Sequence, residues 1–214
     1  MRLGTDVHTL VLGPVARQDE AVVIYDGERR GNAWRDFKAT HPGRTIVTAK
    51  EHAESQARAQ TIAIAVMSDP VAGPYLDGMR EESLRWTVAG RACGGRVDVR
   101  GTALVELKTA FDVNPARFYW HAMRLGYFGQ LGFYHDGIIA AGHPAPTHAV
   151  IIAVESKAPH PVVVYELTAN ALDLGRKQWR LLFERLRACE ESDQWPGYAQ
   201  GPVPLDVPES EDVV

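Results

Sequence analysis

The segment 103–109 most constrains what this chain can fold into, because it carries an acid and an amine inside an otherwise apolar strand. Side chains alternate across a strand, so Glu106 and Lys108 share one face. Val105 and Leu107 then pack on the opposite face. Burying two charged groups is costly unless something binds them. The segment therefore predicts a polar site built on a nearly buried strand.

A preceding strand, residues 92–99, brings a second carboxylate to the same place. Residues 101–102 make a tight connection, so Asp98 can lie close to Glu106. Two carboxylates beside a lysine form a hard oxygen site for a divalent cation, with a positive charge next to it. That arrangement suits metal-assisted hydrolysis of a phosphodiester. A purely structural salt bridge between Glu106 and Lys108 is the alternative, and the rest of the chain has to decide.

Composition indicates an ordinary globular protein. The 214 residues suffice for one domain with a real core, and 45% hydrophobic with 23% charged residues is typical of that class. No run approaches the roughly 18 apolar residues of a membrane span, and the start shows no signal-peptide pattern. We expect a cytoplasmic location and no membrane partner. The two cysteines, Cys93 and Cys189, exclude a four-cysteine zinc or iron–sulfur site.

The formal net charge of −4 is unusual for a protein that binds nucleic acid. However, residues 201–214 carry four acidic residues and no basic one, so the remainder is neutral. A neutral body that contains an acidic site can still present a basic groove. We therefore expect one domain over residues 1–199, followed by a mobile acidic, proline-rich tail over residues 200–214.

Hydrophobic patterning and capping signals predict an α/β fold with a central mixed sheet flanked by helices. Residues 115–134 form an aromatic-rich helix whose glycines indicate close packing on the sheet or a local break. The strands 81–88, 92–99 and 103–109 form a meander, so Glu81 either faces the same site or lies on a solvated face. The other expected elements are helices at 1–12, 32–40, 48–67 and 169–189, a short helix and turn over 71–79, and strands at 21–25, 147–154 and 162–167.

Three further polar residues could reach this site. His8 lies on the first helix, one turn after Gly4, although a lone histidine there is more often packed than a ligand. Gln130 and Tyr134 are four residues apart and share one face of the aromatic helix. Both could contact a phosphate, but aromatic helix faces are usually core.

Five stretches of the chain together carry a resemblance to a known superfamily. They are, in chain order, Gly4-Thr5-Asp6-Val7-His8, Glu81-Glu82-Ser83-Leu84-Arg85-Trp86, Gly95-Arg96-Val97-Asp98, Val105-Glu106-Leu107-Lys108-Thr109 and Gln130-Leu131-Gly132-Phe133-Tyr134. These stretches resemble motifs of the PD-(D/E)xK nucleases, and more specifically of the RecE-type (exonuclease VIII-like) exonucleases of phages and prophages, over about residues 2–198. The late segment Trp195-Pro196-Gly197-Tyr198 is similar too. Val97 stands where that family often has proline, and Glu106 where this branch often has aspartate.

The resemblance implies a restriction-endonuclease-like core and a role for each motif residue. Lys108 would position or polarise the attacking water, and Gln130 and Tyr134 would orient the scissile phosphate or Lys108. One or two Mg²⁺ ions, with Mn²⁺ as a substitute, would be held by Asp98, Glu106, the backbone carbonyl of Leu107, His8 and Glu81. The predicted DNA contacts are Arg29, Arg30, Arg96, Arg124 and Thr109.

The function implied is metal-dependent, 5′→3′ degradation of one strand of linear double-stranded DNA. The 3′ overhang would serve a single-strand-annealing partner, and the protein would form a homo-oligomer such as a tetrameric ring. The alternatives are a RecB-like single-strand nuclease, an endonuclease of the same fold, or a catalytically inactive DNA-binding module. A metal-independent interaction domain would leave the cluster of Asp98, Glu106 and Lys108 unexplained.

Overall fold

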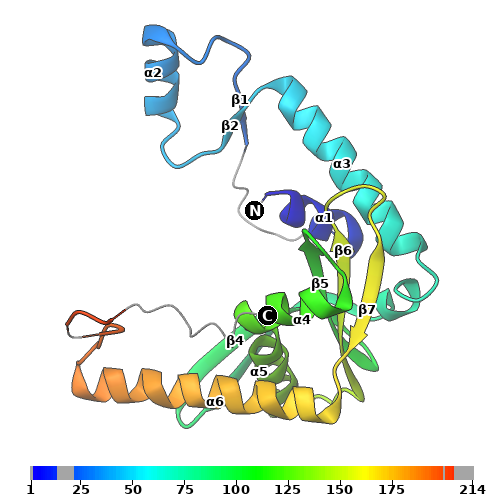
Figure 1. Ribbon diagram of the computed structural model, residues 1–214, viewed down its shortest axis with the longest axis vertical. Coiled ribbons are helices and arrows are strands. Elements are labelled where there is room, and N and C mark those ends of the chain that lie inside the picture. Colours follow the sequence, from blue (N-terminus) through cyan, green and yellow to red (C-terminus); the bar gives the residue numbers. More distant parts are fainter. Residues whose placement is uncertain (1, 14–21, 200, 205–214) are drawn as a thin grey trace. The chain divides into compact units, whose positions relative to one another are not determined.

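A computed structural model describes residues 2–13, 22–199 and 201–204 (Figure 1). The chain forms two compact units, Met1–Trp179 and Arg180–Val214. In chain order the elements are α1 (Arg2–Leu12), β1 (Val23–Ile24), α2 (Gly31–Thr40), β2 (Ile46–Val47), α3 (Ala49–Ser68), the 3₁₀ helix η1 (Gly73–Leu76), β3 (Met79–Val88), β4 (Arg91–Arg100), β5 (Ala103–Ala110), α4 (Pro115–Arg124), α5 (Tyr127–Ala140), β6 (His148–Glu155), β7 (Val162–Glu166) and α6 (Ala169–Ser192).

The central sheet has five strands in the order β3-β4-β5-β6-β7. Strands β5 and β6 are parallel, and the other neighbours are antiparallel. Parallel neighbours cannot be joined by a tight turn, so α4 and α5 form the crossover between β5 and β6 (Figure 1). The predicted meander and the central mixed sheet with helices are both confirmed.

Strand β5 separates two apolar clusters. On one face Val105 and Leu107 pack with residues of α1 and α3, among them Val7 and Ile62. On the other face Leu104 packs in the cluster that holds the buried residues of α4 and α5. The alternation expected for this strand is therefore confirmed, and it fixes which helices each side chain meets.

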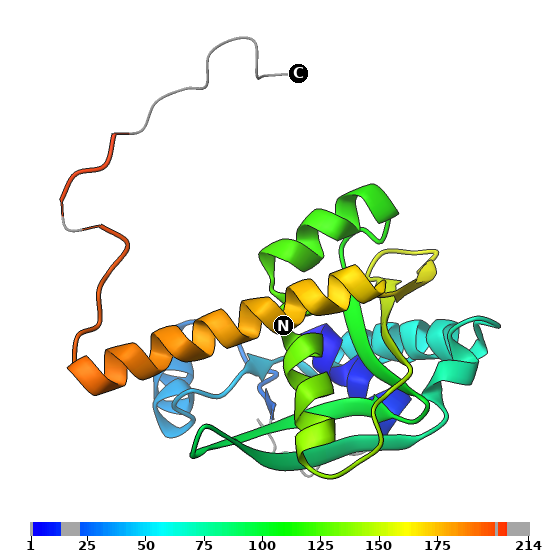
Figure 2. The same ribbon diagram turned by 90° about the horizontal axis from the view of Figure 1, so that it is seen from below.

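The helix predicted over residues 115–134 is two helices, so that boundary is wrong. Asn114 caps α4 through a hydrogen bond from the Ala116 N–H (3.1 Å). Gly126 separates α4 from α5 with a φ of +71°, a conformation that glycine adopts without steric cost. The chain changes direction there, as the two green helices show (Figure 2). The close packing expected of the glycines is with α6, since a Cβ on Gly132 would lie 2.5 Å from the Arg176 nitrogen.

The remaining expectations need few corrections. Thr48 and Glu51 form the predicted capping box at the start of α3. The short strand β2 was not predicted, because two residues give no alternation to recognise. Part of the expected strand 21–25 and most of the tail lie outside the described residues. Among the helices that the structure describes, none has the length and apolarity needed to cross a membrane.

Candidate functional site

Helix α1 and strands β3 and β4 each supply one potential metal ligand to a common point. One ligand atom from each of His8, Glu81 and Asp98 lies within 4.8 Å of the others. The His8 Nδ1 atom is 3.8 Å from Glu81 Oε1, and its Nε2 atom is 3.7 Å from Asp98 Oδ2. Their convergence is the arrangement that the motif resemblance predicts.

An unusual backbone conformation accompanies Glu81. The strand register pairs Arg80 with Val99 and Glu82 with Val97, which places Glu81 opposite Asp98. Glu81 has a φ of +51°, in the left-handed region that residues with a Cβ rarely adopt. Conformations of this kind cost on the order of 1–3 kcal/mol and persist where surrounding structure enforces them. Here the strained residue is one of the three candidate ligands.

The peptide groups of Leu107 tie α1 and β4 to strand β5. The Leu107 N–H donates to Asp98 Oδ2 (2.7 Å), and the Leu107 carbonyl oxygen lies 2.6 Å from His8 Nε2. The predicted carbonyl ligand therefore lies beside two of the side-chain ligands. The side chain of Leu107 points the other way, into the apolar core.

Glu106 and Lys108 form a hydrogen-bonded network with α5. The Lys108 ammonium donates to Glu106 Oε1 (2.7 Å) and to Gln130 Oε1 (3.1 Å). The Gln130 amide in turn donates to Glu106 Oε1 (2.7 Å). One oxygen of Glu106 is thus fully engaged, which leaves Glu106 Oε2 for another partner. The face-sharing inferred for Glu106 and Lys108 is confirmed, and Gln130 lies where the sequence places it.

Burial and neighbouring charges shift two pKa values in this network. Burial, and the nearby Asp98 carboxylate after it, raise the pKa of Glu106 to about 7. Burial by itself would lower the pKa of Lys108, but the nearby acidic groups, Glu106 first and then Asp98, together raise it overall. Lys108 is therefore a cation at neutral pH and can attract a phosphate or orient a water.

The site has the chemistry of a divalent-cation site. Among the described residues, Glu81 Oε1 and Glu106 Oε2 are buried carboxylate oxygens without a hydrogen-bond partner. A buried, unpaired acceptor is destabilising, and a bound cation satisfies it. Carboxylate and carbonyl oxygens with one imidazole nitrogen suit Mg²⁺ or Mn²⁺. His8, Glu81, Asp98, the Leu107 carbonyl and Glu106 would hold such an ion.

Tyr134 explains a glycine of the Gly95–Asp98 motif. A Cβ on Gly95 would overlap Tyr134 Cε1, so the tyrosine ring occupies the space that a side chain would need. Burial, followed by the charge of Glu106, raises the pKa of Tyr134. The phenol therefore stays neutral and can donate a hydrogen bond. Two motifs about 35 residues apart in the chain are in this way parts of one site.

Two of the predicted DNA contacts lie at this site. Arg96 approaches Glu81, with Nη1 3.7 Å from Oε2. The Thr109 hydroxyl is buried, and within the described chain it has no hydrogen-bond partner. Thr109 faces Gly4 of α1, since a Cβ added to that glycine would lie 3.9 Å from the hydroxyl oxygen. Arg96 thus lies beside a candidate ligand, and Thr109 lies beside α1, the helix that carries His8.

The other three arginines are not brought to the ligands. Arg29 is paired with Glu51, and Arg30 with Glu28, both near the start of α2 and α3. Arg124 is exposed at the end of α4. Their predicted role in binding DNA stays a prediction.

Sequence reasoning missed Tyr127. The Lys108 Nζ atom lies 4.6 Å from the centroid of its ring, which is cation–π geometry. Tyr127 is three residues before Gln130, so helical spacing places both on one face of α5. That spacing was the available signal, but an aromatic residue among so many others is more simply interpreted as core.

Comparisons with known proteins show the family and the fold. Residues 3–201 match the model of a family described as "PDDEXK-like domain of unknown function (DUF3799)". Among solved structures, the fold is similar to the crystal structure of a "putative exonuclease" from Eubacterium rectale, with a TM-score of 0.55 and 14% sequence identity. The similarity covers 81% of this chain and 71% of that one. No curated protein matches the chain in sequence.

Proposed function

Since the chain belongs to the PDDEXK-like domain family DUF3799, we propose that it is a metal-dependent deoxyribonuclease acting on the ends of linear double-stranded DNA. It removes nucleotides from one strand, in the 5′→3′ direction, and leaves a 3′ overhang. Its cofactor is Mg²⁺, which Mn²⁺ can replace.

One observation carries the proposal: two glutamates of the site each have a buried carboxylate oxygen without a hydrogen-bond partner among the described residues, and one of them contacts a partly buried lysine cation. Glu81 and Glu106 each have such an oxygen within the described part of the chain, and Lys108 is 2.7 Å from the other oxygen of Glu106. A structural salt bridge would need only Glu106 and Lys108. It would not require His8, Asp98 and a strained Glu81 to converge as well.

Each residue has a task in the proposed hydrolysis. A bound divalent cation would lower the pKa of water and offset the charge that builds on the phosphate. Lys108, as a cation, orients the attacking water and faces the phosphate oxygens. Gln130 fixes Lys108 and Glu106 at once, through the hydrogen bonds it makes to both. Tyr134 donates a hydrogen bond to the scissile phosphate or holds Lys108 in place.

The direction of degradation, the overhang and the partners rest on the motif resemblance to RecE-type exonucleases. The similarity in fold to the "putative exonuclease" from Eubacterium rectale supports cutting from an end. We propose that the protein forms a ring-like homo-oligomer, such as a tetramer, and passes its overhang to a single-strand-annealing protein. A homo-oligomer encircling DNA would allow repeated cutting without release of the DNA.

The test uses linear duplex DNA labelled at the 5′ end in one sample and at the 3′ end in another. Each is incubated with the protein in Mg²⁺ and in EDTA, beside a circular duplex. We expect rapid metal-dependent release of the 5′ label, with circles left intact.

Other outcomes would redirect the proposal. Cut circles would identify an endonuclease of the same fold. Faster cutting of single-stranded than of double-stranded DNA would identify a RecB-like nuclease. DNA binding without cutting in Mg²⁺ or Mn²⁺ would leave an inactive binding module and refute the enzyme.

A further inference from the structure

Helix α4 and a residue shortly before it, Phe111, expose large aromatic side chains. Phe111 is 67% exposed and Trp120 71% exposed, although both belong to the most apolar residue types. Together with Arg117, His121 and Arg124 they line one hollow on the surface, which we call the α4 surface. Large exposed apolar side chains that line one hollow together suggest a binding surface, whereas single scattered ones do not.

The α4 surface is connected to the candidate catalytic lysine by direct contacts. Phe111 follows immediately after β5, the strand that carries Lys108. The Lys108 ammonium lies over the ring of Tyr127, and the Tyr127 hydroxyl is 3.5 Å from His121 Nε2. His121 in turn lines the α4 surface. The α4 surface is therefore linked through two side chains, Tyr127 and His121, to the candidate catalytic lysine.

Positive charge surrounds the aromatic rings. The Lys157 ammonium, in the segment between β6 and β7, lies 3.9 Å from the centroid of the Phe111 ring. Two arginines line the hollow against one acid, Asp112, which pairs with Arg117. The excess of cations complements a phosphate backbone, and the rings offer flat faces to bases. This is the combination by which proteins bind single strands without reading their sequence.

We propose that the α4 surface binds unpaired bases of single-stranded DNA next to the scissile phosphate. The bases stack on Trp120 and Phe111, while Arg124 and Lys157 contact the adjoining phosphates. This inference rests on the proposed nuclease function and deepens it, since it assigns a place to the single strand beside the cut. Phosphate contacts by themselves would bind a strand whether or not it carried bases, so the bases are the feature to test.

The experiment measures binding apart from cutting. A short fluorescent oligothymidylate and an abasic strand of equal length and charge are titrated with protein in EDTA, and fluorescence anisotropy is recorded. We expect the wild-type protein to bind the strand with bases about fivefold tighter or more, as stacking of one base predicts. Equal affinity for the two strands would overturn the proposal.

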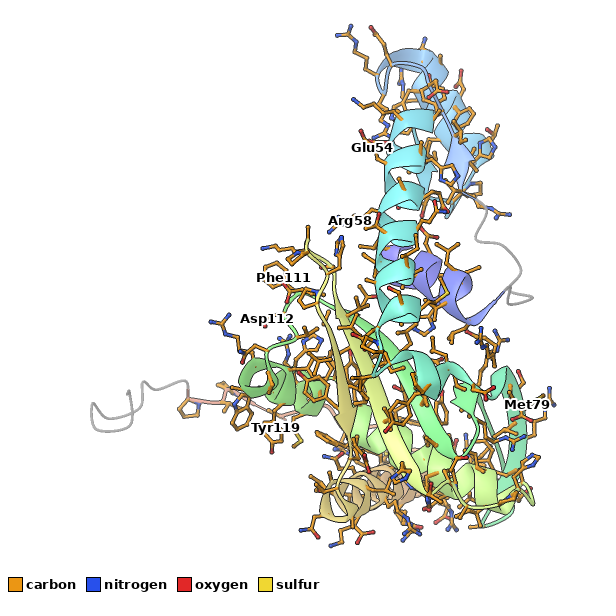
Figure 3. The ribbon with its side chains drawn as sticks, turned by 90° about the vertical axis from the view of Figure 1, so that its right-hand side faces the viewer. Glu54, Arg58, Met79, Phe111, Asp112 and Tyr119 are labelled. Atoms are coloured by element: carbon orange, nitrogen blue, oxygen red, sulfur yellow. The ribbon has the colours of Figure 1, made fainter. Side chains whose placement is uncertain are left out.

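Four variants locate the effect. Trp120→Ala and Phe111→Ala should each remove most of the preference for bases, while leaving the affinity for the abasic strand unchanged. Trp120→Phe should restore the preference, because it keeps a flat aromatic face. Trp120→Leu keeps apolar area without that face and should not. As a control, Met79→Ala, at an exposed apolar position on β3 away from the α4 surface, should behave as wild type (Figure 3).

A Trp120→Leu variant with wild-type preference would overturn stacking as the mode of base binding, because apolar area without a flat aromatic face would then suffice. One further result would assign the surface to a protein partner. A Trp120→Ala variant with unchanged DNA binding but a smaller size in light scattering would identify a contact with a second copy of this chain. The thermal melting of each variant is recorded, and the exposed positions of both rings predict no loss of fold.

The outcomes separate this inference from the proposed function. A protein that releases the DNA label but shows no base preference refutes the inference alone. A protein that prefers bases but never cuts refutes the nuclease and leaves the surface in place.

Discussion

Alternate residues of strand β5 point to opposite faces of the sheet, and the side chains on the two faces differ in polarity. On the face toward α1 and α3, Val105 and Leu107 are buried among apolar side chains and satisfy no polar group. On the face toward α5, Glu106 and Lys108 are engaged in a hydrogen-bonded network with Gln130. At the centre of the strand, apolar packing by Val105 and Leu107 and the polar network of Glu106 and Lys108 therefore lie on separate sides. Substitutions on the two faces should therefore have separable effects.

The largest effect should come from Lys108→Ala. Removing the cation that faces the phosphate should lower the cutting rate well over a hundredfold, on the order of 3 kcal/mol or more. The melting temperature should change little, and binding of DNA and metal should remain. Release of label and a thermal melt measure the two effects. Lys177→Ala, on an exposed position of α6, is the matched control. A Lys108→Ala protein that still cuts would contradict the catalytic role assigned to the polar face of β5.

Leu107→Ala should show the opposite behaviour. Deleting a fully buried leucine leaves a cavity, and the free energy of unfolding should fall by about 2–5 kcal/mol. The backbone groups of Leu107 that face the site are retained, so each folded molecule should still cut. Urea unfolding gives the first quantity and the rate per folded molecule the second. Leu181→Ala, at an exposed position, should stay within about 0.5 kcal/mol of wild type.

Glu106→Gln should stabilise the metal-free protein while it abolishes cutting. The pKa of Glu106 is raised to about 7, above its unfolded value, so the carboxyl group contributes stability below about pH 4.5. That contribution is lost as the pH rises through 7. Glutamine cannot ionise, so the variant should gain on wild type by on the order of 1–3 kcal/mol across this window.

Melting temperatures in EDTA at pH 5 and pH 8 test this prediction. The difference between Glu106→Gln and wild type should be more favourable to the variant at pH 8. A difference independent of pH would mean that Glu106 is already ionised in the folded chain at pH 5, and that burial does not raise its pKa.

The smallest effect should come from Tyr127→Leu. Losing the cation–π contact with Lys108 should weaken the positioning of the ammonium by about 0.5–2 kcal/mol, a slowing of a few-fold to about thirtyfold. Tyr127→Phe keeps the ring and should cut at close to the wild-type rate. The two rates, measured at saturating DNA, show whether the polar network around Lys108 extends to Tyr127 of α5. Equal rates for the two variants would exclude the ring from the site.

The sequence predicted the β5 faces because alternation is a local rule. Val105, Glu106, Leu107 and Lys108 lie where that rule places them. The position of His8 is different in kind. Its contact with the Leu107 carbonyl joins residues 99 apart, and no spacing within a helix indicates such a partner. Only the order of the five motifs suggested it.

Glu81 and Gly126 show why other features of the site and fold could not be predicted from the sequence. Strand alternation places Glu81 on the same face as Ser83 and Arg85, both of which are exposed. In the structure Glu81 instead lies in the site, and its backbone has a left-handed conformation. A non-glycine residue in that conformation gives no local signal. Gly126 could be recognised as a break, but the direction in which α5 leaves it is decided by packing against the sheet and α6.

The 99-residue separation between His8 and Leu107 also has a consequence during synthesis of the protein. Synthesis proceeds from the N-terminus, so α1 is made long before the strand that it contacts and before Gln130. No partial chain that lacks α5 contains the complete site. We therefore expect a ribosome-bound chain to be harmless to DNA until most of it has emerged. The order of the residues would itself delay the moment at which a newly made copy can cut.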